Sequence, residues 1–189
     1  MSIPRIARFA SELDAALAGP AADEAALLAR VRPLMAALVE DDGWLPRSHA
    51  EPHPVHYQQY LLHRDPGARY SLVSFVWGPG QRTPVHDHTV WGVIGMLRGG
   101  ECDQRYRRRD GRLEPDGPEH TLLPGMTAMV SPRLGDIHRV RNLHQDRVSV
   151  SIHLYGGDIG AIERSVFDPA DGRSKVFISG YAAPRADLN

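Results

Sequence analysis

The sequence predicts a mainly β fold, an antiparallel sandwich or barrel, with a helical layer at its N-terminus. Three observations lead to this fold class. The first forty or so residues carry apolar side chains at helical spacing, short apolar or alternating runs follow after about residue 56, and clusters rich in Gly, Pro, Asn and Asp separate those runs. We expect one domain over residues 1–189, with the helical layer at 1–45 and the barrel at 56–180.

The N-terminal layer is expected to contain two helices. The first ends at Gly19-Pro20, a combination that stops helices. Pro33 lies inside the second and is expected to kink or split it. The apolar residues of this second segment recur at helical spacing and are Leu27, Leu28, Val31, Leu34, Met35 and Leu38.

The barrel strands are expected where apolar or alternating runs lie between turn signals. These runs read YQQYLL, YSLVSFVW, VWGVIGML, CDQRYRR, HTLLP, MTAMV, IHRVRNL, VSVSIHLY and SKVFISG. Between two arginine-rich stretches, the pair Asp110-Gly111 predicts a tight hairpin.

The amino-acid composition indicates which binding partners and which cellular compartment to expect. The 189 residues include 22 basic and 23 acidic side chains and carry a formal net charge of −1, which gives no reason to expect nucleic acid or a membrane as partner. A single cysteine, Cys102, excludes an intrachain disulfide and fits a reducing compartment. Residues 1–19 lack the apolar core of a signal peptide, so a cytoplasmic location is expected. The sequence leaves the oligomeric state open, a homo-oligomer included.

Two histidines, His86 and His88, stand one residue apart before an apolar run. On a strand, residues i and i+2 face the same side, so their imidazoles would make half of a metal site. A lone pair of this kind is more often an ordinary polar face. Gly80 lies six residues before His86 and Gly99 lies eleven residues after His88, and this spacing enters the resemblance described next.

A second segment, GMTAMVSPRLGDIHRVRN, supplies Pro132, Gly135, His138 and Asn142. Together the two segments resemble the two motifs of the cupin superfamily, a jelly-roll barrel or double-stranded β-helix, although the proline-to-glycine spacing is one residue longer than usual. The resemblance implies that His138 joins His86 and His88 as third ligand. Many cupins add a glutamate four or five residues after the second histidine, where this chain has glycine and valine. Three imidazoles without a carboxylate suit Fe(II), Zn(II), Cu(II) or Ni(II) better than Mg²⁺ or Ca²⁺.

The run VSVSIHLY places Ser151, His153 and Tyr155 at alternate positions, so all three should face one side of a strand. Hydroxyl, imidazole and phenol can then hydrogen bond in series toward the metal pocket. Alone, such a stripe would be read as a structural ladder or a solvent-facing strand. Beside a metal site, we interpret it as a relay of catalytic residues.

With this relay, roughly residues 56–165 resemble the thiol dioxygenase family, which includes cysteine dioxygenase and bacterial 3-mercaptopropionate dioxygenase. The resemblance implies one Fe(II) per chain on His86, His88 and His138, with O2 and a small thiol as substrates and a sulfinic acid as product. It also implies that Ser151, His153 and Tyr155 orient one another around the bound substrates.

Departures from the mammalian-type enzymes favour 3-mercaptopropionate as the thiol. Gly92 occupies the position of a cysteine that is cross-linked to the relay tyrosine in those enzymes, and Gln59 occupies that of an arginine that binds the substrate carboxylate. The resemblance to the bacterial branch implies that Arg164 binds the carboxylate instead, with Gln59 adding one donor. A surface salt bridge of Arg164 with a neighbouring acid is the plainer interpretation.

Three alternatives stay open. The chain could be a cysteine dioxygenase that produces cysteine sulfinate. It could be another cupin enzyme that uses zinc, nickel or manganese, although zinc chemistry gives no reason for the Ser-His-Tyr stripe. It could also be a non-catalytic cupin that binds a small molecule or stores metal.

Overall fold

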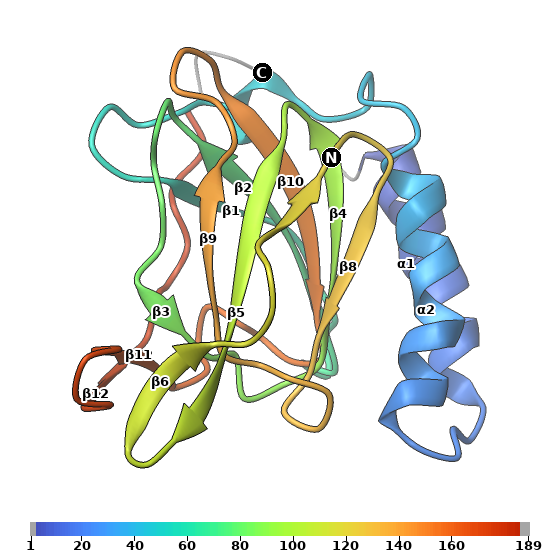
Figure 1. The fold of residues 1–189 in the computed structure, drawn as a ribbon. Helices are drawn as coiled ribbons and strands as arrows, with labels where there is room; N and C mark the ends of the chain where they lie inside the picture. The colour runs from blue at the N-terminus through green and yellow to red at the C-terminus, as the bar shows by residue number, and fades with distance from the viewer. Residues whose placement is uncertain (1–2, 186–189) are drawn as a thin grey trace.

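The computed structural model describes residues 3–185. Two helices are followed by a short 3-10 turn and then almost entirely by strands (Figure 1). The helical elements are α1 (Pro4–Ala18), α2 (Glu24–Leu38) and η1 (Arg47–His49). The strands are β1 (Gln58–Arg64), β2 (Ser71–Trp77), β3 (Val85–His86), β4 (Gly92–Arg98), β5 (Glu101–Arg109), β6 (Arg112–Pro115), β7 (His120–Leu122), β8 (Thr127–Val130), β9 (His138–Asn142), β10 (Ser149–Tyr155), β11 (Arg164–Phe167) and β12 (Ser174–Phe177).

The strands form two antiparallel sheets. One has the order β1-β2-β10-β4-β8, and the other has the order β12-β11-β3-β9-β5-β6, with β7 paired to β5. Strands distant in the sequence therefore lie side by side, as β2 and β10 do. This crossed order of short antiparallel strands confirms the predicted fold class, a mainly β jelly-roll barrel of the cupin kind with helices before it.

The two helices lie together against the outer face of the first sheet (Figure 1). Asp23 caps α2, because its side chain accepts a hydrogen bond of 2.8 Å from the backbone N–H of Ala26. The expectation that Pro33 would split the helix is wrong, since α2 runs without a break through it. Buried Val31 and Met35, on either side of Pro33, pack into the core with the sheet and hold the helix in place.

Alternation along the central strands divides the core in two. On β10, Val150, Ile152 and Leu154 pack with the helices, whereas Tyr155 packs in the barrel interior. All seven residues of β10 are buried, because this sheet is covered on both faces. The helices and the sheet share one core. The single domain over residues 1–189 stays a prediction, and its residues 1–2 and 186–189 lie outside the described part of the chain.

Three strands differ from expectation. The first histidine pair does not lie wholly on a strand, because β3 contains only Val85 and His86 and ends before His88. Strands β6 and β11 form in segments that were expected to be turn or irregular. The predicted hairpin is confirmed, since Asp110 and Gly111 join β5 to β6 with φ angles of 48° and 79°, a combination typical of a type I′ turn.

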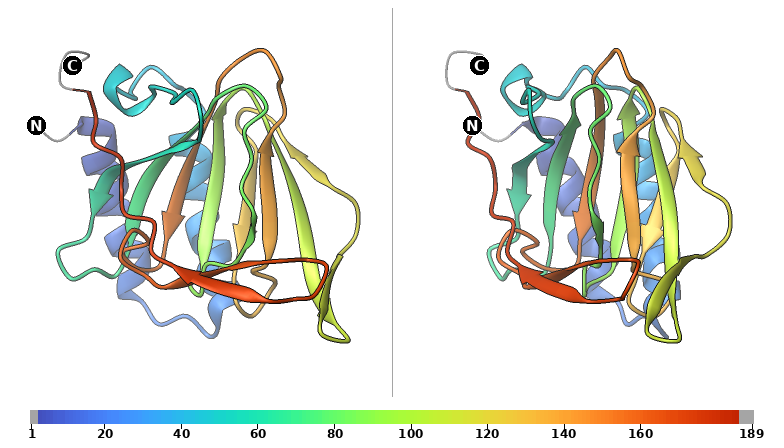
Figure 2. Two further views of the ribbon diagram at one scale, coloured as in Figure 1. Left: turned by 90° about the vertical axis from the view of Figure 1, so that its left-hand side faces the viewer. Right: turned by 60° about the vertical axis from the view of Figure 1, so that its left-hand side comes forward.

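The last strands close one end of the barrel. The β11–β12 hairpin lies across the other strands in both views of Figure 2, and β11 pairs with β3 beside His86. The chain then returns along β1, where the N–H of Ala182 donates to the carbonyl of Gln59 at 2.8 Å. Among the described residues, no helix has the length and apolar character needed to span a membrane.

Candidate metal centre

His86, His88 and His138 converge at one point inside the barrel. One ring nitrogen from each lies within 4.8 Å of the other two, and all three side chains are buried. The ring centroids are 4.8 to 4.9 Å apart. His86 and His138 come from directly paired positions of β3 and β9, and His88 lies two residues beyond His86, just after the end of β3. Among the described residues, this is the one group of three or more His, Cys, Asp or Glu side chains with such spacing.

The Nδ1 atom of each histidine already has a partner. His86 Nδ1 lies 3.1 Å from the carbonyl oxygen of Pro84, His88 Nδ1 lies 2.9 Å from Asp136, and His138 Nδ1 lies 2.9 Å from Asp103. An oxygen at each Nδ1 favours the tautomer with hydrogen there, which leaves Nε2 with a lone pair for a cation. The three rings are thus arranged so that they could hold a metal ion.

The electrostatic environment keeps His86 and His88 neutral. Burial, and then the neighbouring His138, lower the pKa values of His86 and His88 well below the usual range of histidine. Metal ligation needs the neutral imidazole, so this environment favours binding of a cation. A set of three imidazole nitrogens fits Fe(II), Zn(II), Cu(II) or Ni(II).

Sequence reasoning missed Asp103 and Asp136. Asp136 also accepts hydrogen bonds from the backbone N–H groups of His88 and Thr89, at 3.0 and 2.9 Å, so it fixes the bend after β3 as well as the ring. Its position two residues before His138 was the one available signal. Asp103 comes from β5 and reaches His138 through the pairing of β5 with β9, which no local pattern reveals.

Ser151, His153 and Tyr155 form the expected series of contacts. Ser151 Oγ lies 2.8 Å from His153 Nε2, and His153 Nδ1 lies 2.8 Å from the Tyr155 hydroxyl oxygen. The Tyr155 ring stacks on His88, with centroids 5.2 Å apart, so the series ends at the metal-ligand cluster. Burial lowers the pKa of His153 and raises that of Tyr155, which keeps both groups uncharged.

A fourth group, which the sequence did not suggest, lies at the far end of this series. Glu101, 2% exposed, accepts a hydrogen bond from Ser151 Oγ. The indole N–H of Trp77 donates to the same Ser151 oxygen at 3.2 Å. Burial raises the pKa of Glu101 to about 7.

Gly92 lies directly opposite Tyr155 in the pairing of β4 with β10. A Cβ atom at Gly92 would be 2.9 Å from Cδ1 of Tyr155, so a side chain at this position would meet the phenol ring. The only cysteine of the chain, Cys102, points elsewhere, with its sulfur 3.8 Å from the hydroxyl of Thr121. Tyr155 is therefore not linked to a sulfur.

A cavity of about 290 Å³ adjoins the cluster and contains the other two predicted residues, Arg164 and Gln59. Its walls are mostly apolar or aromatic, and no Asp or Glu is among the described residues that line it. The lining residues are Tyr57, Gln59, Phe75, Thr83, Pro84, His86, Tyr155, Arg164, Val166, Lys175 and Phe177.

Arg164 is a buried cation without a carboxylate partner among the described residues. It is 4% exposed, donates 2.5 Å to Ser179 Oγ and lies over the ring of Phe177 at 4.6 Å, while its Nε has no hydrogen-bond partner. The salt bridge with Glu163 or Asp168 that the plainer interpretation required is not formed. A buried guanidinium with a free donor is suited to an anionic ligand.

The C-terminal segment covers this cavity. Ser179 accepts from both Arg164 and Gln59, and the amide of Gln59 also donates 2.8 Å to the carbonyl of Gly180. Phe177 of β12 contributes to the wall. The segment after β12 thus holds in place both residues that were expected to contact a substrate.

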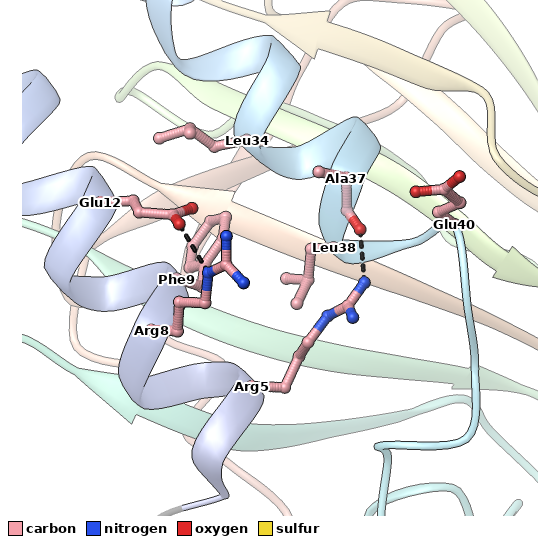
Figure 3. Close-up of a pocket in the computed structure, with 8 residues that line it drawn as sticks. All are labelled: Arg5, Arg8, Phe9, Glu12, Leu34, Ala37, Leu38 and Glu40. Carbon is pink, nitrogen blue, oxygen red and sulfur yellow. Dashed lines mark hydrogen bonds and ion pairs between the residues drawn. The ribbon is translucent and has the colours of Figure 1, made fainter.

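A second hollow, between α1 and α2, has no comparable chemistry. It has a volume of about 240 Å³ (Figure 3). Three of its charged side chains already have partners, since Arg8 pairs with Glu12 at 2.8 Å and Arg5 donates 2.7 Å to the carbonyl of Ala37. The hollow is a packing groove of the helical layer.

The chain is similar to known proteins over part of its length. Cysteine dioxygenase type 1 of Danio rerio is 29% identical over 92 residues, which are 46% of this chain and 45% of that protein. The enzyme of that name from Homo sapiens is 28% identical over 102 residues, 52% of this chain and 50% of that protein. The chain spans about half the length of the curated relatives it matches.

Solved structures with similar strand arrangements include a protein from Thermus thermophilus, with a TM-score of 0.46 and 21% identity over 59% of this chain and 92% of that one. A cupin superfamily protein from Desulfitobacterium hafniense has a TM-score of 0.46 and 15% identity, over 60% of this chain and 90% of that one. The family model described as cysteine dioxygenase type I matches residues 7–167, from the first helix to the end of β11. By this match over most of its length, the chain belongs to the cysteine dioxygenase type I family.

Proposed function

We propose that the chain is a non-haem Fe(II) thiol dioxygenase that converts a small thiol carboxylate, preferably 3-mercaptopropionate, to a sulfinic acid. The observation that carries this proposal is the shared cavity. His86 of the candidate metal cluster, Tyr155 of the relay and Arg164, a buried cation, all line one cavity of about 290 Å³. Membership of the cysteine dioxygenase type I family supports thiol oxidation as the reaction.

The cluster of His86, His88 and His138 would hold the iron. Bound there, Fe(II) would supply thiol acidification and activation of O2, and both oxygen atoms would go to sulfur, so that the thiol itself supplies the electrons and no external reductant is needed. The carboxylates of Asp103 and Asp136 keep two of the ligands in the tautomer that this requires.

Arg164 would bind the substrate carboxylate and so place the sulfur near the three histidines. The planar guanidinium can make two parallel bonds to a carboxylate, and the apolar walls of the cavity strengthen them by excluding water. Gln59 lines the same cavity but already donates to Ser179 and Gly180, so its part is to hold the C-terminal segment closed as well as to border the substrate.

Tyr155 would orient the reacting groups through its hydroxyl, with His153 and Ser151 orienting Tyr155 in turn. The three groups are buried and uncharged, so they can position a proton without adding charge to the site. Such fixed partners lower the cost of arranging reactants at the moment of reaction.

The preference for 3-mercaptopropionate rests on charge. Its carboxylate matches Arg164, and it has no ammonium group. Cysteine would bring an α-ammonium into a cavity whose described lining contains no Asp or Glu to pair with it. A desolvated ammonium without a partner is unfavourable, so the cavity favours the simpler thiol carboxylate.

Cysteine dioxygenase is the second candidate, because the family model and the curated relatives carry that name. Cysteine has the same thiol and carboxylate, and its ammonium could be met by the carbonyl and hydroxyl oxygens around the cavity. The two candidates differ in the expected order of catalytic efficiency with the two thiols.

One experiment separates all these possibilities. The protein is loaded with Fe(II) without oxygen, and oxygen uptake is then measured with 3-mercaptopropionate, cysteine and cysteamine, with sulfinate as the quantified product. We expect the highest kcat/KM with 3-mercaptopropionate and the lowest with cysteamine, which lacks a carboxylate. Uptake with none of the thiols would refute the dioxygenase proposal, and parallel loading with Zn(II), Ni(II) or Mn(II) would then test the other cupin chemistries.

The predicted cytoplasmic location and the single-domain organisation stay predictions. The lone buried thiol of Cys102 is consistent with a reducing compartment. The balanced charge of the chain gives no support for a nucleic-acid or membrane partner.

A further inference from the structure

The position of Glu101 gives the hydrogen-bonded series a direction. An ionised carboxylate can only accept hydrogen bonds, whereas a protonated one can also donate. Glu101 contacts Ser151, which contacts His153, which contacts Tyr155, and each link is a direct hydrogen bond between side chains. The protonation state at one end therefore restricts the donors and acceptors along the whole series.

With Glu101 ionised, the Ser151 hydroxyl must donate to the carboxylate. Ser151 Oγ then accepts from His153, which carries its hydrogen on Nε2. His153 Nδ1 has a lone pair in this tautomer and accepts from the Tyr155 hydroxyl. The phenol hydrogen is used inside the series and is not directed into the cavity.

With Glu101 protonated, each hydrogen bond of the series from Glu101 through Ser151 and His153 to Tyr155 reverses its direction. The carboxylic acid donates to Ser151 Oγ, and Ser151 donates to His153 Nε2. His153 now carries its hydrogen on Nδ1 and donates to the phenol oxygen, so the Tyr155 hydrogen is free to point into the cavity. Trp77 donates to Ser151 in both arrangements, and Ser151 is fully satisfied in both.

We propose that Glu101 is a positioning residue of this site, which sets the direction of hydrogen bonding through Ser151 and His153 and thereby decides whether the Tyr155 hydroxyl donates into the substrate cavity. The inference rests on the proposed function only where the Tyr155 hydroxyl hydrogen is taken to bond to a bound substrate. Glu101 itself touches neither the cavity nor the three clustered histidines, and acts through Ser151.

The surroundings of Glu101 make both protonation states accessible near neutral pH. Burial raises its pKa to about 7, the hydrogen bonds from Ser151 and Trp77 lower it, and the charge of Asp103 on the same strand raises it. From the neighbouring strands, β9 places neutral Asn142 opposite Glu101 and β7 places Leu122 there. His153, on β10, is the other titratable group of the series, and it stays neutral because burial lowers its pKa.

The first test reads the tautomer of His153 without any turnover. Full-length protein with nitrogen-15-labelled histidine, loaded with diamagnetic Zn(II) and also metal-free, is followed by NMR from pH 5.5 to 8.5. The His153→Gln variant identifies the resonances. We expect hydrogen on Nδ1 at low pH and on Nε2 at high pH, with a midpoint near 7. A tautomer that does not change would overturn the proposal, whether or not the protein is a dioxygenase.

Two variants show whether Glu101 drives the change. In Glu101→Gln the side chain has the same shape and no charge to titrate, so the tautomer should not follow pH. In Ser151→Ala the link is cut while Glu101 is retained, and the tautomer should again be independent of pH. A change with the same midpoint in either variant would contradict the assignment.

The second test uses the pH dependence of turnover with the best thiol. If Tyr155 must donate into the cavity, kcat should fall by about tenfold as pH rises through 7, within the range typical for loss of a supporting hydrogen bond. This step should be absent from Glu101→Gln and from Tyr155→Phe, while KM changes little. A step that survives in Glu101→Gln would show that another group produces it.

Discussion

A carboxylate oxygen of Asp103 lies 2.9 Å from Nδ1 of His138, and both side chains are buried. Because the bond fixes the ring so that Nε2 faces the other two histidines, Asp103→Asn should weaken metal binding by about 10–100-fold. The asparagine amide can still accept through its oxygen, but it lacks the charge that favours hydrogen on Nδ1. Competition with a chelator of known affinity, using Fe(II) or Zn(II), measures the change.

The control for this prediction is Asp116→Asn. Asp116 lies at the exposed end of the β5–β6 hairpin, where it pairs with Arg107 at 3.6 Å. Exposed pairs of this kind contribute little, so metal affinity should not change. If Asp103→Asn bound metal as tightly as the unaltered protein, the orienting role of Asp103 would be wrong.

Replacement of Arg164 should separate thiols that carry a carboxylate from those that do not. We expect Arg164→Met to lower kcat/KM for 3-mercaptopropionate by about 10–100-fold, since hydrogen bonds to a charged group contribute about 1.5–3 kcal/mol. Oxygen uptake with 2-mercaptoethanol, which has no carboxylate, should change much less. Equal losses with both thiols would mean that Arg164 supports the fold of the site and does not bind substrate.

Lys175→Met is the matched control for that prediction. Lys175 also lines the cavity and is a cation, but its side chain is exposed and unpaired with any acid in the described part of the chain. Solvent screens its charge, so its loss should change kcat/KM only slightly.

Removal of the phenol hydroxyl should impair turnover without loss of metal. Tyr155→Phe retains the ring that stacks on His88 at 5.2 Å and loses only the oxygen bonded to His153. We expect kcat to fall by about 10–100-fold. Metal content, measured on the same samples, should equal that of the unaltered protein. Full turnover by Tyr155→Phe would show that the Ser-His-Tyr series is structural.

The sequence predicted those parts of the site whose residues are close together in the chain and follow a local periodic pattern. His153 and its neighbours occupy alternate positions of one strand, and strand periodicity alone places them on a common face. The partners Glu101 and Asp103 could not be predicted in this way, since Glu101 reaches β10 of the opposite sheet and Asp103 reaches His138 on the neighbouring strand β9. Their roles depend on which strands become neighbours, and short-range pattern carries no such information.

The errors in the fold have a similar origin. A two-residue strand such as β3 has no periodicity to detect, and the backbone of His86 is held there by pairing with β9 and β11. Pro33 was expected to kink or split α2 on local grounds, but packing of the helix on the sheet keeps it from splitting.

Gly92 should tolerate no side chain, because its Cα faces the relay tyrosine. In Gly92→Ala the new Cβ would lie 2.9 Å from the Tyr155 ring and 3.0 Å from Val130, so the phenol must shift. Overpacking of this kind costs about 1–3 kcal/mol of stability, and here it should also reduce turnover. Urea unfolding and oxygen uptake on the same preparation measure the two effects.

Gly95→Ala is the matched control on the opposite face of the same strand. Its Cβ would lie 2.7 Å from Val39 and 2.8 Å from Met35, so it also overpacks, but against the helical layer. We expect comparable destabilisation with unchanged kcat. If both variants lost turnover in proportion to stability, the effect at Gly92 would be one of general packing.

The raised pKa of Glu101 predicts how stability depends on pH. The folded protein holds this proton up to a pH of about 7, whereas the unfolded chain releases it near the ordinary value of 4.5. The folded state therefore loses stability as pH rises through this window, by roughly 3 kcal/mol in total at 1.36 kcal/mol per unit. Glu101→Gln has no proton to release. Between pH 5 and pH 8 its free energy of unfolding should therefore rise by about 2–3 kcal/mol relative to that of the unaltered protein.

Urea unfolding of both proteins at pH 5 and pH 8 measures this gain, and the other titrating groups cancel in the difference between them. Glu114→Gln, at an exposed position of β6, should show the same difference from the unaltered protein at both pH values. If the stability of Glu101→Gln relative to the unaltered protein were no larger at pH 8 than at pH 5, the Glu101 carboxylate would ionise in the folded state as easily as in water. Its burial against Ser151 would then have no electrostatic consequence.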